Sequence, residues 1–66
     1  MTYYELLLEL NEFTTVSRES LDACKESTDN APGELVAAWC DGDYDEDIEI
    51  LVQELEIDLR MRNLLK

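Results

Sequence analysis

The side chains in this chain that are best suited to chemistry are carboxylates crowded into one short run. The run contains Asp41, Asp43, Asp45, Glu46, Asp47 and Glu49. It belongs to a longer segment, from Glu26 to Asp58, that carries twelve acidic residues and no basic one. Carboxylates three or four positions apart on a helix are about 5–6 Å apart at Cβ, comparable to neighbouring phosphates on a nucleic-acid strand. The run is therefore expected to bind basic groups, although a solvated face with favourable charge at a helix start is the plainer explanation.

The same run contains part of a calcium-binding pattern. Asp41, Asp43 and Asp45 place oxygens at alternate positions, as the first half of an EF-hand loop does. The second half departs from the pattern, because position six is Glu46 rather than glycine and position twelve is Val52 rather than glutamate. We therefore expect no specific metal site and no cofactor, and instead a loose condensation of cations around the run.

Groups that could carry out catalysis are scarce. The chain has no histidine, so it lacks the commonest general base and any zinc site built from Cys and His. No glycine-rich phosphate loop and no nucleophile with an adjacent base can be assembled. Cys24 and Cys40 are interpreted as two buried thiols, with a disulfide as the alternative. We expect no catalytic residues and no enzymatic activity.

Length and charge narrow the class of protein further. The 66 residues are expected to form one domain, residues 1–66, with a formal net charge of −12 at pH 7. Direct binding to nucleic acid or to an anionic membrane is not expected, because both need Lys and Arg to neutralise phosphates. No apolar run approaches the roughly 20 residues of a membrane span, and the first residues lack a basic region typical of a signal peptide. A cytoplasmic protein is therefore expected.

Hydrophobic periodicity predicts a helix over residues 2–13, the first of the elements that position the carboxylates. Thr2 and Glu5 fit a capping box, in which each side chain satisfies a backbone donor at the helix start. Apolar residues recur at helical spacing along one stripe, which is expected to face the core. The stripe contains Tyr3, Leu6, Leu7, Leu10 and Phe13.

Two shorter helices are predicted on either side of a loop at residues 27–33. Ser17 is the expected N-cap of the second helix, because its hydroxyl can accept a hydrogen bond from an unpaired backbone N–H. The third helix is expected over about 32–40. Pro32 suits its first position, where a missing N–H costs nothing, and Gly42 is the expected stop.

The longest helix is predicted at the C-terminal end, where Asp43 and Glu46 fit a second capping box. Two apolar rows lie on nearly opposite faces of this helix. The first row contains Ile48, Leu51, Val52, Leu55 and Leu59. The second row contains Ile50, Ile57, Met61 and Leu64. Only one row can face the core, so the second is expected to be covered by the other helices or to form a homodimer interface.

These elements predict an all-α fold, a small bundle of three to four helices with a long C-terminal helix. The alternative is an α+β fold with a strand at about 55–62, because residues there alternate between apolar and polar. Leu, Glu, Met and Arg are good helix formers, and no second alternating segment offers the strand a pairing partner. The helical interpretation is therefore favoured.

The expected function is that of a non-catalytic inhibitor or regulator whose carboxylates bind a basic protein, with nucleic-acid-binding proteins as the first class. Trp39 and Tyr44 are expected to add apolar anchors beside the carboxylates. In size, charge and lack of catalytic groups the chain is similar in type, though not in motif, to the decoys that phages and other mobile elements use against restriction or CRISPR effectors. Two alternatives remain: an adaptor or toxin-neutralising protein that binds through the second apolar row, and a cation-binding module.

Overall fold

Four helices occur in the part of the chain that the structure describes, and no strand occurs there. The computed structural model describes residues 1–42 and 47–64. Its helices are α1 (Tyr3–Leu10), α2 (Arg18–Cys24), α3 (Gly33–Asp41) and α4 (Ile48–Met61). The prediction of an all-α bundle with a long C-terminal helix is therefore confirmed.

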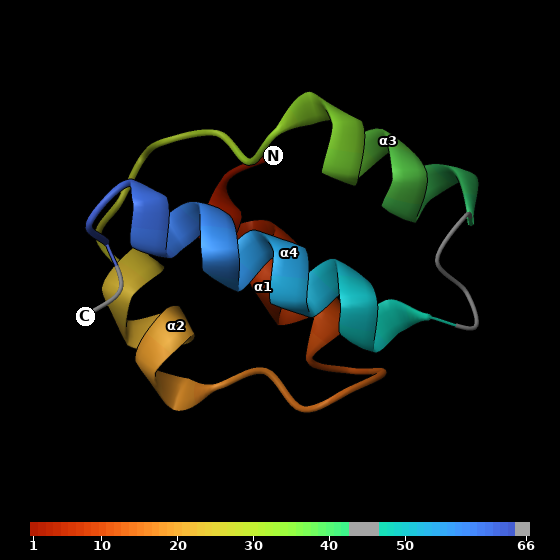
Figure 1. Ribbon diagram of the computed structural model, residues 1–66, viewed down its shortest axis with the longest axis horizontal. Helices are drawn as coiled ribbons and strands as arrows, with labels where there is room; N and C mark the ends of the chain where they lie inside the picture. Colours follow the sequence, from red (N-terminus) through yellow and green to blue (C-terminus); the bar gives the residue numbers. More distant parts are fainter. Residues whose placement is uncertain (43–46, 65–66) are drawn as a thin grey trace.

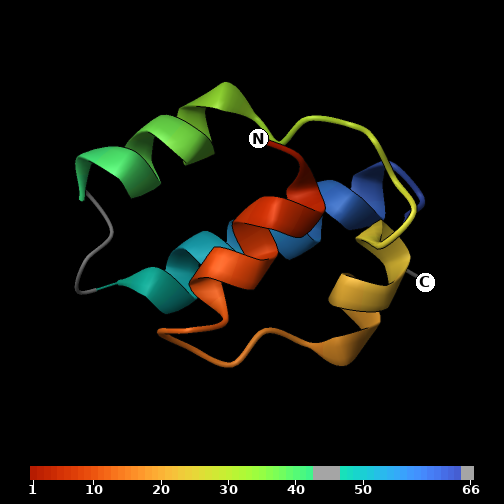
Figure 2. The same ribbon diagram turned by 180° about the vertical axis from the view of Figure 1, so that it is seen from behind.

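The helices α1 and α4 form the centre of the molecule. Viewed from one side, α4 lies in front of α1 (Figure 1), and from the opposite side α1 lies in front of α4 (Figure 2). Helix α3 runs along one edge of this pair and contacts α4, whereas α2 lies on the other side and contacts α1. The Cα radius of gyration is 10.7 Å, close to the roughly 11 Å of a folded chain of this length. The central pair is thus the frame for the two shorter helices.

Leucines of the central pair build the core. Six of them have no exposed surface: Leu6, Leu7, Leu10, Leu51, Leu55 and Leu59. Burial of each such side chain contributes roughly 1.5–3 kcal/mol. Helix α3 has no buried residue and packs against this core only through the partly buried Leu35, Val36 and Trp39. Helix α3 therefore contributes less to the core than α1 and α4 do.

The helix starts and stops predicted from the sequence are found at three places. Thr2 and Glu5 form the capping box, with the Thr2 hydroxyl accepting from the Glu5 N–H at 3.2 Å and the Glu5 carboxylate accepting from the Thr2 N–H at 3.0 Å. The backbone hydrogen bond from Thr2 also lowers the pKa of Glu5. Ser17 caps α2 by accepting from the Ser20 N–H at 3.2 Å. Gly42 ends α3 with φ 78°, a left-handed conformation that glycine adopts without strain.

Helix α1 ends earlier than predicted, at Leu10 instead of residue 13. The Asn11 side-chain oxygen accepts a hydrogen bond from the Val16 N–H at 3.2 Å, which closes a turn after the helix. That turn carries Phe13 away from the buried stripe and leaves 64% of its surface exposed. The prediction that Phe13 is a core residue is wrong, because the stripe continues only as long as the helix does.

The two later helices begin near the predicted positions. Pro32 has ψ 129° and is the N-cap of α3 rather than its first helical residue, so the prediction was one position early. Asp47 is the N-cap of α4 and makes no side-chain capping hydrogen bond. The capping box predicted for Asp43 and Glu46 lies outside the described residues.

Residues 55–61 are helical, so the alternative of a strand in this segment is wrong. The alternation of apolar and polar residues has another cause. Leu55 and Leu59 belong to the buried row of α4, whereas Ile57 and Met61 belong to the exposed row on the other side of the helix. Two rows that are offset by two residues produce the same period as a strand.

The loop between α2 and α3 is fastened to the N-terminus. The Ala31 N–H donates to the Met1 carbonyl at 2.9 Å, and the Tyr3 N–H donates to the Asp29 carbonyl at 3.3 Å. Ala31 itself is buried in the core. Because the loop is held at this point, the start of α3 is fixed relative to α1.

A polar link joins α1 to α4 beside the leucine core. The Tyr3 hydroxyl donates a hydrogen bond to the Asp58 carboxylate, and the Arg62 Nε lies 3.2 Å from the same carboxylate. The Arg62 guanidinium carbon is 5.6 Å from the centroid of the Tyr3 ring, within the range of a cation–π contact. Burial of Tyr3, followed by its hydrogen bond to Asp58 and the charge of that carboxylate, raises the pKa of Tyr3 to about 12.

Removing the Tyr3 hydroxyl should destabilise the fold. Tyr3→Phe is expected to lower the free energy of unfolding by about 1–2 kcal/mol, because it leaves the half-buried Asp58 with Arg62 as its one remaining donor. Urea unfolding followed by circular dichroism measures the change. Tyr4→Phe, which removes the same group from a half-buried tyrosine of the same helix, is the matched control and should change the free energy by less than about 0.5 kcal/mol. Equal losses in the two variants would show that the link to Asp58 contributes nothing.

The stabilisation from Tyr3 should disappear at alkaline pH. The folded protein holds the phenolic proton more tightly than the unfolded chain does, because the Tyr3 pKa rises from 10.0 to about 12 on folding. The contribution is fully present below about pH 10 and is lost as the pH rises to about 12. Wild-type protein is expected to lose its stability advantage over Tyr3→Phe across this window in thermal unfolding. An advantage that stays constant up to pH 12 contradicts the prediction.

Candidate protein-binding surface

The predicted carboxylate run is divided between the end of α3, the start of α4 and the connection between them. Asp41 is the last residue of α3, Asp47 is the N-cap of α4 and Glu49 lies in the first turn of α4. All three side chains are exposed, and together they are called the acidic end below. The other predicted residues of this region lie outside the described residues: Asp43, Tyr44, Asp45 and Glu46.

Helix dipoles explain only part of the acidic end. Asp47 and Glu49 lie at the positive N-terminal end of α4, where a carboxylate stabilises a helix by typically 0.3–1 kcal/mol. Asp41 lies at the negative C-terminal end of α3, and no basic residue occurs in the last turn of that helix. Its charge therefore opposes the helix dipole. The plain explanation by helix stability accounts for Asp47 and Glu49 but fails for Asp41.

The Lys and Arg residues within the described ranges are found at the other end of the molecule. Arg18 begins α2, Lys25 follows it, and Arg60 and Arg62 lie at the end of α4. Figure 1 shows α2 and the last turn of α4 on one side, and the end of α3 and the start of α4 on the other. Arg18 and Leu64 line the same open pocket, so the two basic segments lie next to each other. Carboxylates occur on all four helices, but the fold keeps the acidic end apart from these cations.

Trp39, predicted as an exposed anchor, is half-buried and partly structural. It packs against the core, and its ring centroid lies 5.4 Å from that of Phe13, at an interplanar angle of 60°. Such tilted pairs are favourable beyond the area that they bury. Because Phe13 stays largely exposed, the aromatic pair presents apolar surface. Its other member, Trp39, lies two residues before Asp41 on α3. The apolar stripe of α1 did not predict Phe13 as part of this surface, because its position depends on where α1 ends.

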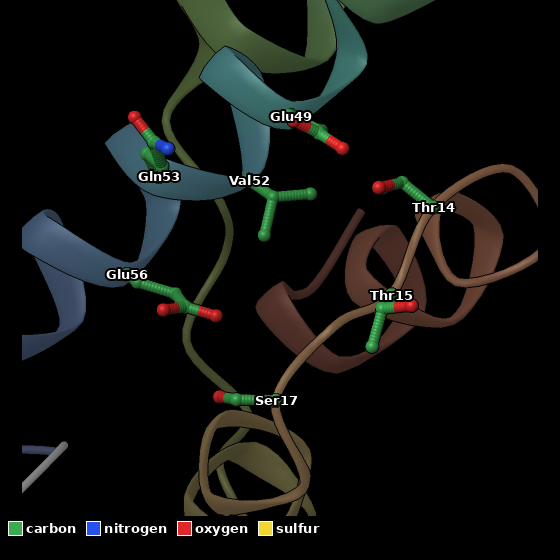
Figure 3. A pocket seen from close by; sticks show the side chains of 7 residues that line it. All are labelled: Thr14, Thr15, Ser17, Glu49, Val52, Gln53 and Glu56. Atoms are coloured by element: carbon green, nitrogen blue, oxygen red, sulfur yellow. The ribbon is translucent and has the colours of Figure 1, made fainter.

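A pocket of about 330 Å³ lies beside the first turns of α4. Its walls come from α4 and from the segment between α1 and α2. The lining residues are Thr14, Thr15, Ser17, Glu49, Val52, Gln53 and Glu56. Figure 3 shows Val52 between the two glutamates and facing the threonines, with Gln53 turned aside. Two carboxylates and three hydroxyls can accept hydrogen bonds from an ammonium or guanidinium group, and no feature of the sequence revealed this pairing of segments.

The second apolar row of α4 is exposed over most of its length. The exposed fractions are 46% for Ile50, 56% for Ile57 and 78% for Met61. Leu64 does not continue the row, because α4 ends at Met61 and Asn63 adopts a positive φ of 61°. The Leu64 N–H then donates to the Leu59 carbonyl at 2.9 Å, and its side chain packs partly against the core. The homodimer interface expected at this row stays a prediction.

The two cysteines lie in different surroundings, and both are free thiols. Cys24 is fully buried, and this burial raises the pKa of its thiol. Cys40 is exposed, because α3 turns Trp39 and two smaller apolar residues toward the core and leaves Cys40 outside. The prediction of two buried thiols is therefore right for Cys24 and wrong for Cys40.

Neither a metal cluster nor a membrane span is found in the described ranges. Within residues 1–42 and 47–64, no three His, Cys, Asp or Glu side chains are placed to hold a metal ion together. In the same ranges, no helix combines the length and the apolar character that crossing a bilayer requires. The EF-hand-like run extends into residues 43–46, which lie between these ranges.

Comparisons of the chain with protein-family models, with curated proteins and with solved structures give no match. Any function must therefore be argued from the surface itself. The described features that bear on it are the acidic end, the aromatic pair beside it, the pocket and the exposed row of α4.

Thiol reactivity should distinguish the two cysteines. In the folded protein, a maleimide reagent is expected to modify Cys40 rapidly and Cys24 at least about tenfold more slowly, because burial keeps Cys24 protonated and inaccessible. Mass spectrometry of the time course measures both rates, and Cys40→Ser isolates the slow one. In urea the two rates should converge. Rapid labelling of Cys24 in the native protein contradicts the packing described here.

Proposed function

We propose that this protein is a non-catalytic inhibitor or regulator that binds a basic protein through its acidic end, as a mimic of nucleic acid. The observation that supports the proposal is the placement of Asp41, Asp47 and Glu49 on two helix ends, apart from the Lys and Arg side chains that the structure describes. Proteins that bind nucleic acid, including restriction and CRISPR effectors, have the basic grooves that such an array fits.

The cost of these charges favours a use outside the fold. Like charges destabilise a compact state, and a chain of 66 residues has little apolar area with which to offset a net charge of −12. In addition, the negative charge of Asp41 interacts unfavourably with the dipole of its own helix. A binding partner that pairs with these carboxylates gives a physical reason for their presence.

Inhibition follows from competition for one groove. Carboxylates that occupy the sites of phosphates exclude the nucleic acid, and the field of the acidic end accelerates the encounter with a positively charged target. Charge alone discriminates poorly among basic proteins. The exposed surface of Phe13, supported by Trp39, is suited to supply an apolar contact beside the carboxylates.

An adaptor or toxin-neutralising protein is the second candidate. The exposure of Ile50, Ile57 and Met61 on α4 favours it, because a row of large apolar side chains suits the groove or the helix of another protein. The two candidates differ in the force that holds the complex. Complexes held by the acidic end weaken steeply with salt, whereas those held by the apolar row change little.

Neutralising the acidic end should weaken target binding. Proteins captured from an extract of the source cell are identified, and the affinity of each for the triple variant Asp41→Asn, Asp47→Asn, Glu49→Gln is measured by calorimetry. We expect a loss of at least about tenfold, and a steep loss for wild type between about 50 and 200 mM salt. Nucleic acid should displace the wild-type protein from its target.

The matched control removes the same number of charges at the opposite end of the molecule. The triple variant Glu19→Gln, Asp22→Asn, Glu26→Gln changes three exposed acids in and after α2. Its affinity should fall by less than about threefold, since exposed charges farther away than the Debye length of about 10 Å are screened. Equal losses from both triple variants, or a target that nucleic acid does not displace, would refute the mimic.

A further inference from the structure

The pocket beside α4 has a carboxylate near each of its two ends. Glu49 and Glu56 both line it and are separated by two turns of α4. They therefore lie within about 20° of each other around the helix and about 10.5 Å apart along its axis. Val52, which is only 6% exposed, lies between them on the same wall (Figure 3). The α4 wall of the pocket thus has two anionic ends and an apolar middle.

The opposite wall of the pocket carries hydroxyl groups over a similar length. It is formed by the non-helical segment between α1 and α2, which contributes Thr14, Thr15 and Ser17. Extended chain advances about 3.3–3.6 Å per residue, so the three steps from Thr14 to Ser17 can cover up to about 10–11 Å. Figure 3 shows Thr14 on the side of Glu49 and Ser17 on the side of Glu56. Each carboxylate thus has a hydroxyl across the pocket from it.

The polar groups of the pocket have capacity for a ligand. No Lys or Arg lines the pocket, and within the described ranges neither Glu49 nor Glu56 makes an ion pair or a side-chain hydrogen bond. Glu56 is half-buried, so water solvates its charge less well than that of an exposed acid. The Ser17 hydroxyl already bonds the Ser20 hydroxyl at 2.6 Å and caps α2, which leaves it one acceptor position. The carboxylates are therefore the principal groups available to a cation.

The arrangement fits a flexible chain that carries an ammonium group at each end. An ammonium donates three hydrogen bonds, so each one can serve a carboxylate and the hydroxyl across from it. The hydrocarbon between the two ammonium groups packs on Val52. A span of about 10 Å needs about nine bonds from nitrogen to nitrogen, since three bonds of extended backbone cover about 3.3–3.6 Å. A ligand with a single cationic group pairs with only one end of the pocket.

We infer that this pocket is a binding site for linear diamines and polyamines, with one ammonium at Glu49 and another at Glu56. Its volume of about 330 Å³ is at the lower end of the range for small-molecule sites. The net charge of −12 attracts cations to the whole surface, whereas the fixed spacing of the two glutamates selects among them by length. The inference goes beyond the proposed function and does not depend on it, because the isolated protein contains the whole site.

Selection by length tests the inference. The full-length, isotope-labelled protein is titrated by NMR at about 100 mM salt with three probes. Diaminooctane spans both ends of the pocket, diaminobutane has the same charge but is too short, and octylamine has the same chain with one charge. Diaminooctane should bind at least about fivefold more tightly than either, the effect of one added ion pair at a partly exposed site. Amide signals of residues 14–17 and 49–56 should shift, and those of α3 should not.

Single variants assign the two ends of the site. Glu49→Gln and Glu56→Gln each remove one anionic end, so each should lower the affinity for diaminooctane about fivefold and abolish most of its advantage over octylamine. The matched controls are Glu26→Gln and Glu34→Gln, which remove the same charge from exposed glutamates that do not line the pocket. Each control should change the affinity less than about twofold. Circular dichroism establishes that all four variants remain folded.

Three outcomes would overturn the inference. The first is an affinity for diaminobutane or octylamine equal to that for diaminooctane, because the two ends then do not act together. The second is an equal loss in the pocket variants and the controls, which would show that amines only condense around an acidic surface. The third is a set of shifted amide signals centred outside the pocket. Each outcome leaves the proposed function standing, whose failure is recognised separately by target binding that ignores the acidic-end triple variant.

Discussion

Six leucines buried in the core shared by α1 and α4 have to offset the mutual repulsion of a chain with a net charge of −12. The central helix pair can do so because each helix turns an uninterrupted apolar stripe toward the other. The second helix packs against α1, and α3 rests on the pair with only partly buried side chains. Loss of this central contact would remove the support of every other element, and with it the fixed positions of the charged side chains.

Almost all of the carboxylates that the structure describes lie at the surface. Glu56 and Asp58 are half-buried, and Asp58, with 30% of its side chain exposed, is paired with the Tyr3 hydroxyl and the Arg62 guanidinium. A half-buried charge with two partners costs far less than one without any. The other acids repel one another through solvent, where salt screens them. Apart from acids that stabilise a helix start, such as Glu5 and Glu49, these carboxylates are tolerated rather than required by the fold.

The two faces of helix α4 have different surroundings. Its inner face supplies leucines of the core, and its outer face leaves Ile50, Ile57 and Met61 exposed to solvent. Charge provides rapid and selective encounter with a basic target, whereas apolar contacts provide most of the lasting affinity in protein complexes. The acidic end, the pocket and the exposed row of α4 all include or adjoin the first turns of α4. A target bound there can use both kinds of contact at once.

The sequence alone determined the features that depend on neighbours along the chain. Hydrophobic period and capping residues predicted the four helices, the box of Thr2 and Glu5 and the stop at Gly42, because helix starts and ends are set by local hydrogen bonds and backbone freedom. The buried row of α4 was predicted from the same helical period. The run of carboxylates was also evident, because it can be read directly from the order of the residues.

Only the tertiary structure decided the features that depend on contacts between distant segments. The turn between Asn11 and Val16 moved Phe13 out of the core and brought its ring against Trp39. The orientation of α3 exposed Cys40, and the turn after α4 drew Leu64 away from the exposed row of α4. The separation of the acidic end from the basic residues likewise arose from how the helices pack. Periodicity tells which side of a helix is apolar, but only packing tells which apolar side chains find a partner.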